Sequence, residues 1–551
     1  MTTNAPDQAA IEKSIRTYLD RYGRADAAAA TVLCDEHPAD AVAFTLIDAD
    51  VKATDVTYGW LRESSERFAG GLEALGIKPG DRVATIMGKS PDFLAAVLGI
   101  WRLGAVHVPL FTAFAPAAIT VRLESSGAVA VIADGDQRPK LEPGADMPAD
   151  PPWRIITSGD LFPGDISFKE LMGAAPIKQA AALGGEGTLV EIYTSGTTGM
   201  PKGVVLPLKA LAAIHTYVEY GLDVRDDDVF WCAADPGWAL GLYIGVLGAM
   251  ASRRRSVMIQ PGFTPDLAWR VLSEHGVTNF LAAPTIYRAL RGAEASARPV
   301  KLRCASSAGE PLTPDVNQWA GDALGVEVHD QYGQSEHGML VNNHHHPAVK
   351  RPIKPGSMGT PMPGWRVEVL ENESDEIAAP NTVGRVALSV HDSPLWFFSG
   401  YKGNEEATKA RFTPDGAWYL TGDAGSLDED GYITFYSRDD DVIIMAGYRI
   451  GPAEVESVLA GHPAVAECAV IAAPDQVRGE VIEAFVVLRD GSSGSPDLTK
   501  ELQQLVKARY AAHAYPRVVH FVDALPKTPS GKIQRFVLRD RRRAEVAAAA
   551  D

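Results

Sequence analysis

The segment YTSGTTGMPKGVV, residues 193–205, crowds five hydroxyl side chains and three glycines together with one proline and one lysine. It follows the apolar run TLVEIY and leads directly into GVVL, so we expect a tight connection between two strands. Backbone N–H groups in a glycine-rich turn form a concave anion site, and hydroxyl groups add further donors. Because Lys202 adds a positive charge, the segment predicts a phosphate-binding loop.

Two common nucleotide loops do not match this segment. The GxxxxGK[ST] pattern needs glycine directly before lysine, whereas Pro201 precedes Lys202. The dinucleotide pattern GxGxxG is also absent after the strand. A flexible surface loop is the alternative interpretation, since Ser/Thr/Gly runs are common in loops. The strands expected on both sides favour a phosphate loop of a different kind.

Composition narrows the class of protein. The chain has 551 residues, of which 46% are hydrophobic and 22% charged, which predicts a globular protein of two to four domains. Its net charge of −18 argues against a general nucleic-acid binder and against an anionic membrane surface as partner. A small polyanionic ligand in a local basic pocket remains compatible with that charge.

The cysteines and the apolar segments bear on location. Cys34, Cys232, Cys304 and Cys468 are far apart and form no CxxC pair, so neither a zinc site nor a redox motif is expected. Scattered thiols fit a reducing cytoplasm. The N-terminus carries no apolar segment typical of a signal peptide. The most apolar window contains Arg102 and His107, so no membrane span is predicted.

The texture changes along the chain. Residues 57–135 and 263–284 alternate helical and strand-like segments, which predicts parallel sheets covered by helices. From about residue 355, short strands are broken by Gly, Pro and Asp turns, which indicates a β-rich subdomain. After residue 450 the pattern becomes a compact α+β unit.

Further unusual segments follow the phosphate loop. They are SSAGEPL (306–312), DQYGQSEHG (330–338), YLTGDAG (419–425), SRDDDVIIMAGYRI (437–450) and LPKTPSGKIQR (525–535). With this set, in this order, the chain resembles the ANL family of adenylate-forming enzymes, which includes acyl-CoA synthetases, peptide-synthetase adenylation domains and firefly luciferase. The resemblance is to the acetyl- and medium-chain acyl-CoA synthetase branch, and it covers about residues 40 to 536.

The resemblance implies an α/β fold with a large N-terminal domain and a small mobile C-terminal domain. The large domain would contain two parallel α/β subdomains and a β-rich subdomain within residues 1–438; a hinge at 439–441 would precede an α+β domain at 442–551. The implied reaction uses ATP, Mg²⁺ and coenzyme A. A carboxylate attacks the α-phosphate of ATP, and a thiol then displaces AMP from the acyl-adenylate.

The resemblance also implies where the nucleotide binds. The phosphate loop would hold the β- and γ-phosphates of ATP. Gly309, Glu310 and Pro311 would border the adenine, and Tyr332 would stack on it. Asp423 would accept the ribose hydroxyls, since a carboxylate has two acceptor atoms. Ser335 stands where the family usually has threonine, and it retains the hydroxyl. The implied nucleotide-site residues are Thr194, Ser195, Gly196, Thr197, Thr198, Lys202, Gly309, Glu310, Pro311, Gln331, Tyr332, Gln334, Ser335, Asp423, Arg438 and Arg449.

Lys532 and Glu336 carry the implied chemistry of the first step. Lys532 would bridge the attacking carboxylate and the α-phosphate, where negative charge gathers. Glu336 would be the Mg²⁺ ligand, beside the phosphate oxygens. The alternative for Lys532 is a solvated surface lysine, although the two prolines of PKTPSGK stiffen its loop. Asp440 matches the family's hinge residue.

Coenzyme A contacts are implied for Gly447, Tyr448 and Lys507. Gly447 would let the pantetheine arm pass close to the backbone. IIMAGYR replaces a more polar stretch of the family, so contacts from those side chains are in doubt. The basic tail with Arg539, Arg541, Arg542 and Arg543 could also meet the phosphates of coenzyme A, but a solvated helix end is the favoured interpretation.

Three residues bear on the acid. Trp238 and Leu242 are candidates for the acyl pocket, with core packing as an equal alternative. Acetyl-specific members of the family have tryptophan where this chain has Gly333, so we expect room for an acid larger than acetate. Short- to medium-chain acids are the first expectation and aryl acids the second. Gly333→Trp is expected to shift activity toward acetate.

The histidines of NNHHHP (342–347) are expected in a solvated loop rather than at a metal.

Two rival functions remain. The activated acyl group could be passed to a separate carrier protein or another nucleophile, although free coenzyme A is the simpler acceptor. A non-catalytic nucleotide-binding regulator would be expected to lack the charged residues of the chemistry, whereas Lys532 and Glu336 are both present.

Overall fold

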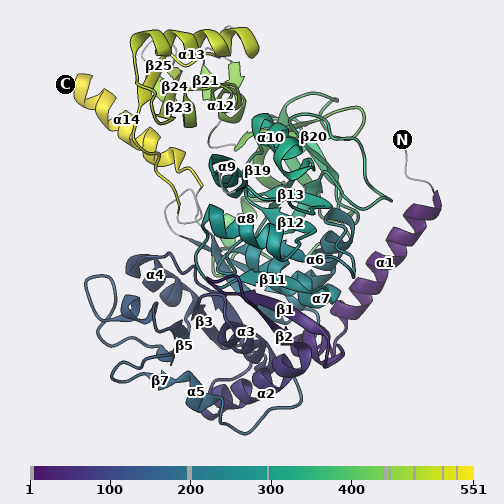
Figure 1. The fold of residues 1–551 in the computed structure, drawn as a ribbon. Helices are drawn as coiled ribbons and strands as arrows, with labels where there is room; N and C mark the ends of the chain where they lie inside the picture. Colours follow the sequence, from purple (N-terminus) through teal and green to yellow (C-terminus); the bar gives the residue numbers. More distant parts are fainter. Residues whose placement is uncertain are drawn as a thin grey trace.

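The computed structural model describes residues 5–194, 201–293, 297–438, 441, 443–445, 448–475, 479–511, 514–528 and 532–550. The described residues form three β-sheets, of seven, thirteen and five strands. Figure 1 shows the C-terminal part as a separate unit beside the larger body, with the N-terminal helix α1 (Ala5–Gly23) on the far side of the molecule from α14 (Arg535–Ala550). None of the described helices combines the length and apolarity needed to cross a membrane.

The first sheet contains the two strands that flank the predicted phosphate loop. Its order is β7-β6-β5-β3-β4-β8-β9, and every pairing is parallel except that of β8 with β9. The strands are β3 (Arg82–Ile86), β4 (Val106–Pro109), β5 (Ala130–Asp134), β6 (Arg154–Ser158), β7 (Ile166–Ser167), β8 (Thr188–Thr194) and β9 (Lys202–Pro207). The predicted loop therefore joins the antiparallel strands β8 and β9.

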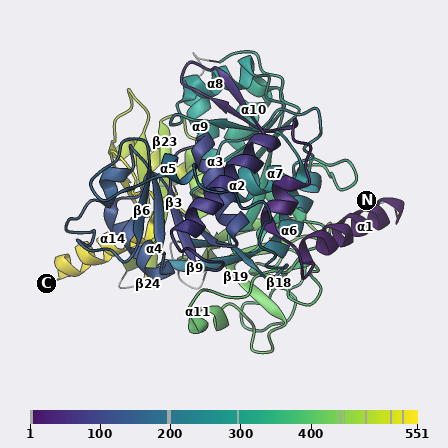
Figure 2. The same cartoon turned by 90° about the horizontal axis from the view of Figure 1, so that it is seen from below.

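Local sequence explains the helices that cover this sheet. Ser90 accepts a hydrogen bond from the Phe93 N–H and caps α3 (Pro91–Leu103), and Gly104 ends that helix in the left-handed conformation. Thr57 caps α2 (Tyr58–Ala74) in the same way. The two helices pack against each other, and Figure 2 shows them side by side. Shorter helices of this region are α4 (Pro116–Ser126) and α5 (Phe168–Leu171).

The second sheet is continuous where the sequence suggests two subdomains. Its order is β17-β18-β19-β20-β16-β15-β14-β13-β12-β10-β11-β1-β2. The parallel part contains β1 (Val42–Ile47), β10 (Phe230–Cys232), β11 (Ser256–Ile259), β12 (Asn279–Ala282), β13 (Cys304–Ala308) and β14 (Val328–Gln334). The antiparallel members are β2 (Ala53–Thr57), β15 (Gly338–Asn342), β16 (Ser357–Pro361), β17 (Val367–Leu370), β18 (Gly384–Ser389), β19 (Trp418–Leu427) and β20 (Ile433–Arg438).

Helices and irregular turns complete the large body. They are α6 (Leu211–Thr216), α7 (Ala249–Ser252), α8 (Pro265–Glu274), α9 (Pro284–Gly292), α10 (Pro314–Leu324), α11 (Glu405–Lys409) and the π-helical turns η1 (Thr31–Asp35), η4 (Tyr217–Gly221) and η5 (Leu240–Gly248). Short 3₁₀ turns lie at η2 (Arg138–Leu141) and η3 (Leu208–Ala210). The main hydrophobic core includes residues from α1 to β20 and joins the two sheets.

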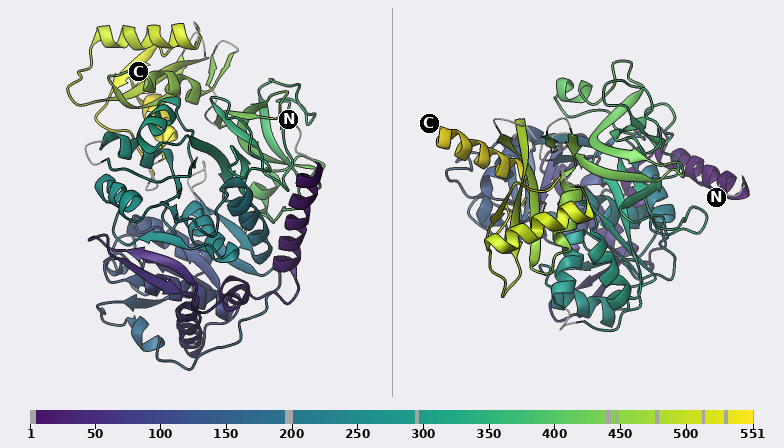
Figure 3. Two further views of the ribbon diagram at one scale, coloured as in Figure 1. Left: turned by 45° about the vertical axis from the view of Figure 1, so that its right-hand side comes forward. Right: turned by 90° about the horizontal axis from the view of Figure 1, so that it is seen from above.

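The C-terminal unit has its own small sheet and core. The strands are β21 (Ile443–Met445), β22 (Tyr448–Ile450), β23 (Val465–Asp475), β24 (Gly479–Leu488) and β25 (Val518–Phe521), and the helices are α12 (Pro452–Ala460), α13 (Pro496–Arg509) and α14. Ile443, Val455 and Leu502 are among its buried residues. Figure 3 shows this unit seated on one end of the large body. The predicted α/β fold with a small α+β C-terminal part is confirmed.

Candidate active site

The site lies where the second sheet changes from parallel to antiparallel. Gly309 and Glu310 directly follow β13, Tyr332 lies near the end of β14, and Asp423 lies in β19. Ligands of open α/β sheets bind outside the carboxyl ends of the strands. The order of the sheet thus brings together residues more than a hundred positions apart in sequence.

Asp423 is held by two partners from β14. The Tyr332 hydroxyl donates to Oδ2 of Asp423, and the Gln334 amide donates to the same oxygen at 2.9 Å. Gln334 also donates to the Thr421 carbonyl at 2.9 Å. Burial, together with the Asp423 charge, raises the pKa of Tyr332 well above its ordinary value, so its hydroxyl remains a donor. Arg438, at the end of β20, is the direct cross-strand partner of Asp423.

Glu336 forms a second charged group with Lys202. Glu336 is buried, and its Oε1 accepts a hydrogen bond of 2.7 Å from the Tyr401 hydroxyl. The Lys202 ammonium lies 5.1 Å from the centre of the Tyr401 ring. Burial lowers the pKa of Lys202, and the charges of Arg411 and Arg438 act in the same direction, whereas Glu336 opposes them. The site therefore concentrates positive charge around one buried carboxylate.

The residues present fit a magnesium ion bound together with a nucleotide. Mg²⁺ is usually held by one or two carboxylates and by substrate phosphates, and it keeps several waters. Glu336 offers such a carboxylate, and within the described parts of the chain no group of three or more His, Cys, Asp or Glu residues could form a separate metal cage. A single carboxylate is therefore suited to a magnesium ion that binds together with the phosphates of a nucleotide.

Lys532 of the C-terminal unit reaches this site. A Cβ atom built on Gly309 would lie 4.0 Å from Cε of Lys532. Gly309 has φ +102°, a conformation that strains other residues, so the backbone turns sharply beside the lysine. Lys532 remains exposed to solvent, but the surrounding protein lowers the pKa of its ammonium group. The negative charges of Glu310, Asp423 and Glu336 act in the opposite direction and raise that pKa.

The turn after β13 is fixed by two side chains and a buried carboxyl group. Glu310 accepts hydrogen bonds from Thr285 and from Arg288, the latter at 2.8 Å. The Leu312 N–H donates to Asp330, and burial raises the pKa of Asp330 to about 7. Pro311 is exposed between them.

The other predicted site residues, including the hinge and coenzyme A candidates, fall into three groups. Ser195, Gly196, Thr197, Thr198, Asp440 and Gly447 lie outside the described residues, and for Tyr448 and Arg449 only the backbone is described. Thr194 ends β8, where its hydroxyl donates to the Lys202 carbonyl at 3.5 Å, and the Ser335 carbonyl accepts from Tyr243. Gln331 does not join the Asp423 group; it contacts Tyr217 and Ser306 in the core.

Trp238 belongs to an aromatic cluster. Its ring centre lies 5.6 Å from those of Phe111 and Phe114, which follow β4. Its indole Nε1 is buried and has no hydrogen-bond partner among the described residues. Leu242 is fully buried in η5. These positions fit an apolar wall near the carboxyl end of the first sheet.

The expected steric effect at Gly333 needs correction. A Cβ atom there would lie 2.2 Å from the Gly338 carbonyl oxygen and 2.8 Å from Cα of Met339, both in β15. The glycine is therefore required by close contact between β14 and β15, where the register shifts between Tyr332 and Gly333. Gly333→Trp would displace β15 before it could close a pocket, so its expected shift toward acetate does not follow.

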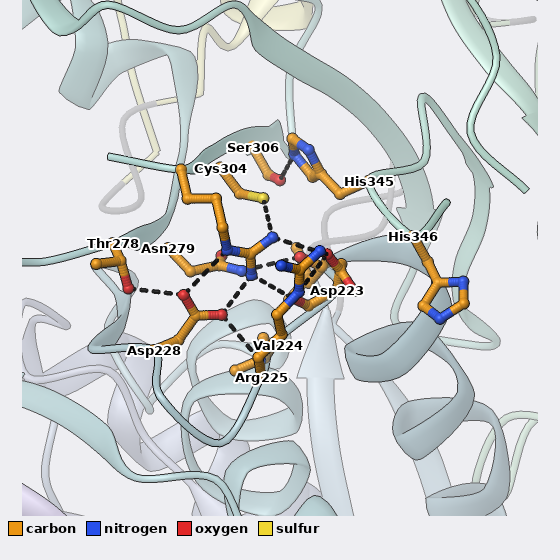
Figure 4. Close-up of polar contacts among 12 residues, drawn as sticks. Asp223, Val224, Arg225, Asp228, Thr278, Asn279, Cys304, Ser306, His345 and His346 are labelled. Atoms are coloured by element: carbon orange, nitrogen blue, oxygen red, sulfur yellow. Dashed lines mark hydrogen bonds and ion pairs between the residues drawn. The ribbon is translucent and has the colours of Figure 1, made fainter. Parts of the chain in front are cut away.

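The expectation of a solvated histidine loop is wrong. His344 and His345 are buried, and His345 hydrogen-bonds Ser306 at 3.0 Å and stacks on His329 with ring centres 3.6 Å apart. Figure 4 shows Ser306 and His345 together in the core next to the contacts of Asp223 and Asp228. Burial lowers the pKa of His344 to about 4, so it stays neutral. The segment packs on η4, where the Gly221 and Tyr220 carbonyls accept the N–H groups of His345 and His346, and the local sequence pattern does not predict that contact.

The basic tail is only partly solvated. Arg539 pairs with Asp441, and Arg542 pairs with Glu483 at 2.7 Å, so both anchor α14 to the C-terminal unit. For these two the prediction of a solvated helix end is wrong, because their carboxylate partners come from distant strands and turns. The Lys507 ammonium lies 3.9 Å from the centre of the Tyr515 ring.

Sequence reasoning missed Tyr401 and Arg411. The Arg411 Nε–H donates to the Tyr401 hydroxyl at 3.3 Å, and Tyr401 in turn contacts Glu336. No local pattern marks either residue. The only hint is their position shortly before YLTGDAG, in a segment rich in turn residues.

Comparison with known proteins gives the same family throughout the chain. Family models described as "AMP-binding enzyme" and "AMP-binding enzyme C-terminal domain" match residues 31–401 and 454–532. An acetyl-coenzyme A synthetase of Bacillus subtilis (strain 168) is 36% identical over 503 residues, covering 88% of this chain and 84% of the relative. A mitochondrial acyl-coenzyme A synthetase of Rattus norvegicus is 36% identical over 515 residues, covering 90% and 86%.

Solved structures agree with these relatives. An acyl-CoA synthetase of Brucella canis is 40% identical with a TM-score of 0.76, covering 98% of this chain and 99% of the other. A benzoate CoA ligase from Burkholderia xenovorans LB400 is 30% identical with a TM-score of 0.82, covering 93% and 100%. The chain therefore belongs to the AMP-binding enzyme family, within the ANL superfamily and its branch of AMP-forming acetyl- and medium-chain acyl-CoA synthetases.

Proposed function

We propose that this protein activates a carboxylic acid with ATP and then transfers the acyl group to coenzyme A. The acid is a short- to medium-chain acid larger than acetate, with an aryl acid as the alternative. The observation that carries the proposal is the approach of Lys532 to Gly309, because it brings the C-terminal lysine beside Glu310, Asp423 and Glu336.

In the first step, a carboxylate oxygen of the acid attacks the α-phosphorus of ATP. The bond between the α-phosphorus and its bridging oxygen breaks, and pyrophosphate leaves. Lys532 places positive charge at the α-phosphate and the attacking carboxylate, where negative charge accumulates. Lys202 and the loop 195–198 hold the phosphates that leave.

The remaining groups position the nucleotide. Asp423, fixed by Tyr332 and Gln334, accepts the ribose hydroxyls, and Arg438 adds a cation on the adjacent strand. Glu336 would hold a magnesium ion together with the phosphates; when bound, the ion neutralises charge on the phosphate oxygens. Phosphoryl chemistry depends mainly on positioning and charge neutralisation, which the charged groups of this site can supply.

In the second step, the thiol of coenzyme A attacks the acyl carbon and AMP leaves. We propose that rotation at Asp440, within the boundary 439–441, replaces Lys532 by the face of the C-terminal unit that carries Gly447 and Tyr448. Hinges absorb such changes in φ and ψ at very few residues. Lys507 and Arg449 remain candidates for contacts to coenzyme A and to the phosphates.

The aromatic cluster supports an acid with apolar bulk. Phe111, Phe114 and Trp238 form a continuous aromatic wall, and structural neighbours include ligases for benzoate and for anthranilate. The relatives include both acetyl- and medium-chain-type synthetases, so the family does not decide the size of the acid. The proposal of an acid larger than acetate therefore rests on the aromatic wall. Cys34, Cys232, Cys304 and Cys468 are buried free thiols, which fits the proposed cytoplasmic location.

AMP release in the presence of ATP and Mg²⁺ tests this function. The acids are acetate, butyrate, hexanoate, octanoate and benzoate, each with coenzyme A and with a phosphopantetheinylated carrier protein. We expect AMP release with coenzyme A that is greater for an acid larger than acetate. Strong preference for acetate would overturn the proposed acid, and release only with the carrier protein would overturn the proposed acceptor.

A further inference from the structure

Tyr401 contacts three charged side chains of the site: Glu336, Arg411 and Lys202. Its hydroxyl donates to Oε1 of Glu336 at 2.7 Å and accepts the Arg411 Nε–H at 3.3 Å. Its ring lies under the Lys202 ammonium at 5.1 Å. The side chain is 5% exposed, so these contacts are largely shielded from water.

The backbone around Tyr401 is anchored to the strand that leaves the phosphate loop. Tyr401 forms an isolated β-bridge with Val204, and the Lys402 N–H donates to the Gly203 carbonyl at 2.8 Å. The Tyr401 N–H donates to the Thr408 hydroxyl at 2.9 Å. The position of the tyrosine is therefore set by β9, independently of its hydroxyl.

Arg411 extends the chain of contacts toward the ribose end. Its Nη1 donates to the Thr421 carbonyl at 3.1 Å, which also accepts from Gln334. Gly422 has φ +75°, and a Cβ there would lie within 2.3 Å of Arg411 Nη1. Asp423 is the next residue. Tyr401 and Arg411 thus connect Glu336 to the strand that presents Asp423.

Glu336 itself is held on one side only. Among the residues that the structure describes, Oε1 of Glu336 is bonded to Tyr401 and no hydrogen bond reaches Oε2. A hydrogen bond to one oxygen restrains the orientation of the carboxylate and leaves its second oxygen available to a ligand. Partners of this kind orient metal ligands, and their loss typically lowers metal affinity about 10- to 100-fold.

We propose that Tyr401, supported by Arg411, is a positioning residue that fixes the Glu336 carboxylate for the magnesium-bound nucleotide. The inference rests on the proposed role of Glu336 in binding that ion. Tyr401 performs no bond-breaking step; it acts through Glu336 and through the ring surface that it presents to Lys202.

Calorimetric binding of α,β-methylene-ATP, a non-hydrolysable analogue, tests the inference without turnover. Each variant is titrated once with excess Mg²⁺ and once with EDTA. Tyr401→Phe keeps the ring under Lys202 and removes only the hydroxyl. We expect about a 10-fold loss of affinity with Mg²⁺ and little change with EDTA. Arg411→Lys, which keeps the charge, is expected to lose less affinity than Arg411→Met.

Tyr432 provides a matched control. It is also 5% exposed, its hydroxyl donates to the Pro352 carbonyl at 2.6 Å, and the Lys354 ammonium lies 4.5 Å from its ring centre. It lies in the turn before β20, away from Glu336. Tyr432→Phe should therefore bind the analogue like the unmodified protein under both conditions.

The variant Glu336→Gln tests the proposed magnesium ligand separately from the role of Tyr401. If Glu336→Gln loses Mg²⁺-dependent affinity and Tyr401→Phe does not, the role of Tyr401 is overturned while that of Glu336 stands. If Glu336→Gln retains that affinity, the proposed magnesium ligand is overturned, and the inference with it. An equal loss for Tyr401→Phe with Mg²⁺ and with EDTA would make Tyr401 merely structural and would also overturn the inference.

Discussion

Gly309 and Lys532 lie next to each other although they belong to different units of the chain: a Cβ on Gly309 would be 4.0 Å from Cε of Lys532. Gly309 follows the central strand β13, whereas Lys532 precedes α14 of the C-terminal unit. The contact closes the C-terminal unit over the residues proposed to bind ATP. It is the arrangement that the proposed first half-reaction requires, with the lysine beside the residues proposed to bind ATP.

Gly309→Ala tests the turn beside Lys532. At φ +102° an alanine is strained by about 1–3 kcal/mol, and the space around the new methyl group is ordinary. We therefore expect weaker ATP binding and a lower kcat/KM for ATP, measured by pyrophosphate release. Gly321→Ala in α10, where nothing lies within 4 Å and φ is not positive, serves as control and should leave both unchanged. Unchanged ATP kinetics in Gly309→Ala would contradict a strained turn at the nucleotide.

The pH dependence should reflect the lowered pKa of Lys532. Although Lys532 is exposed to solvent, the surrounding protein moves that pKa below the ordinary 10.5, so the ammonium loses its proton at lower pH than a free lysine. Because the charged form is the one that acts, kcat/KM for ATP should fall on the alkaline side with an apparent pKa below 10.5. Lys532→Arg, which stays charged, should lack this alkaline limb. A limb that persists in Lys532→Arg would assign it to another group.

Buried neutral histidines predict loss of stability in mild acid. Burial lowers the pKa values of His37, His329 and His344 to about 4, and of His107, His215 and His337 to about 3. Below the ordinary value of 6.5 the unfolded chain binds more protons than the folded one, so the free energy of unfolding falls as pH decreases. Each such histidine contributes a slope approaching about 1.4 kcal/mol per pH unit.

Urea denaturation between pH 7.5 and 5 measures this effect, since carboxylates with ordinary pKa values hardly titrate there. Two carboxyl groups with raised pKa values, Asp330 at about 7 and Asp134 at about 6, act in the opposite direction in this range. Because the histidines outnumber them, the midpoint should still fall as the pH decreases below 6.5. A midpoint that is flat down to pH 5 would contradict the neutral histidine core.

Trp238→Ala tests the proposed acyl wall. Removal of the indole leaves space beside Phe111 and Phe114, so kcat/KM should shift toward bulkier acids. One methylene is worth about 1–3 kcal/mol in an apolar pocket, which sets the scale of the change between neighbouring chain lengths. Trp60→Ala, at an exposed position of α2, is the control and should keep the original preference. The same preference order in both variants would remove Trp238 from the pocket.

Local sequence was sufficient for most of the fold. The expected alternation of helices and strands arises from neighbours within a few residues, as the cap at Ser90 illustrates, and the structure has this alternation. The continuity of the second sheet from β14 through β16 to β20 was not predicted, because strand pairing across long separations leaves no local pattern. The helix α1 was missed as well, since its apolar stripe is weak and it depends on packing against α6.

The candidate site, like the fold, could be predicted from local sequence only in part. SSAGEPL and YLTGDAG are among the segments that carry the family resemblance, and that resemblance implied Gly309 and Asp423, which the fold brings into one site. Burial of His344 and His345, the close backbone contact at Gly333, and the bonds of Tyr401 and Arg411 depend on residues from distant strands. Such contacts follow from the assembled sheets and have no signature in the segments themselves.

Separate assays of the two half-reactions of Lys532→Ala test the central claim most directly. Acid-dependent pyrophosphate release reports the first, and transfer from a preformed acyl-adenylate to coenzyme A reports the second. Lys527→Ala, in the same loop but paired with Glu467 at 2.7 Å, is the control. We predict that Lys532→Ala loses pyrophosphate release by about 10²–10³-fold and retains thioester formation, while Lys527→Ala keeps both. Pyrophosphate release by Lys532→Ala at the rate of the unmodified protein would contradict the account.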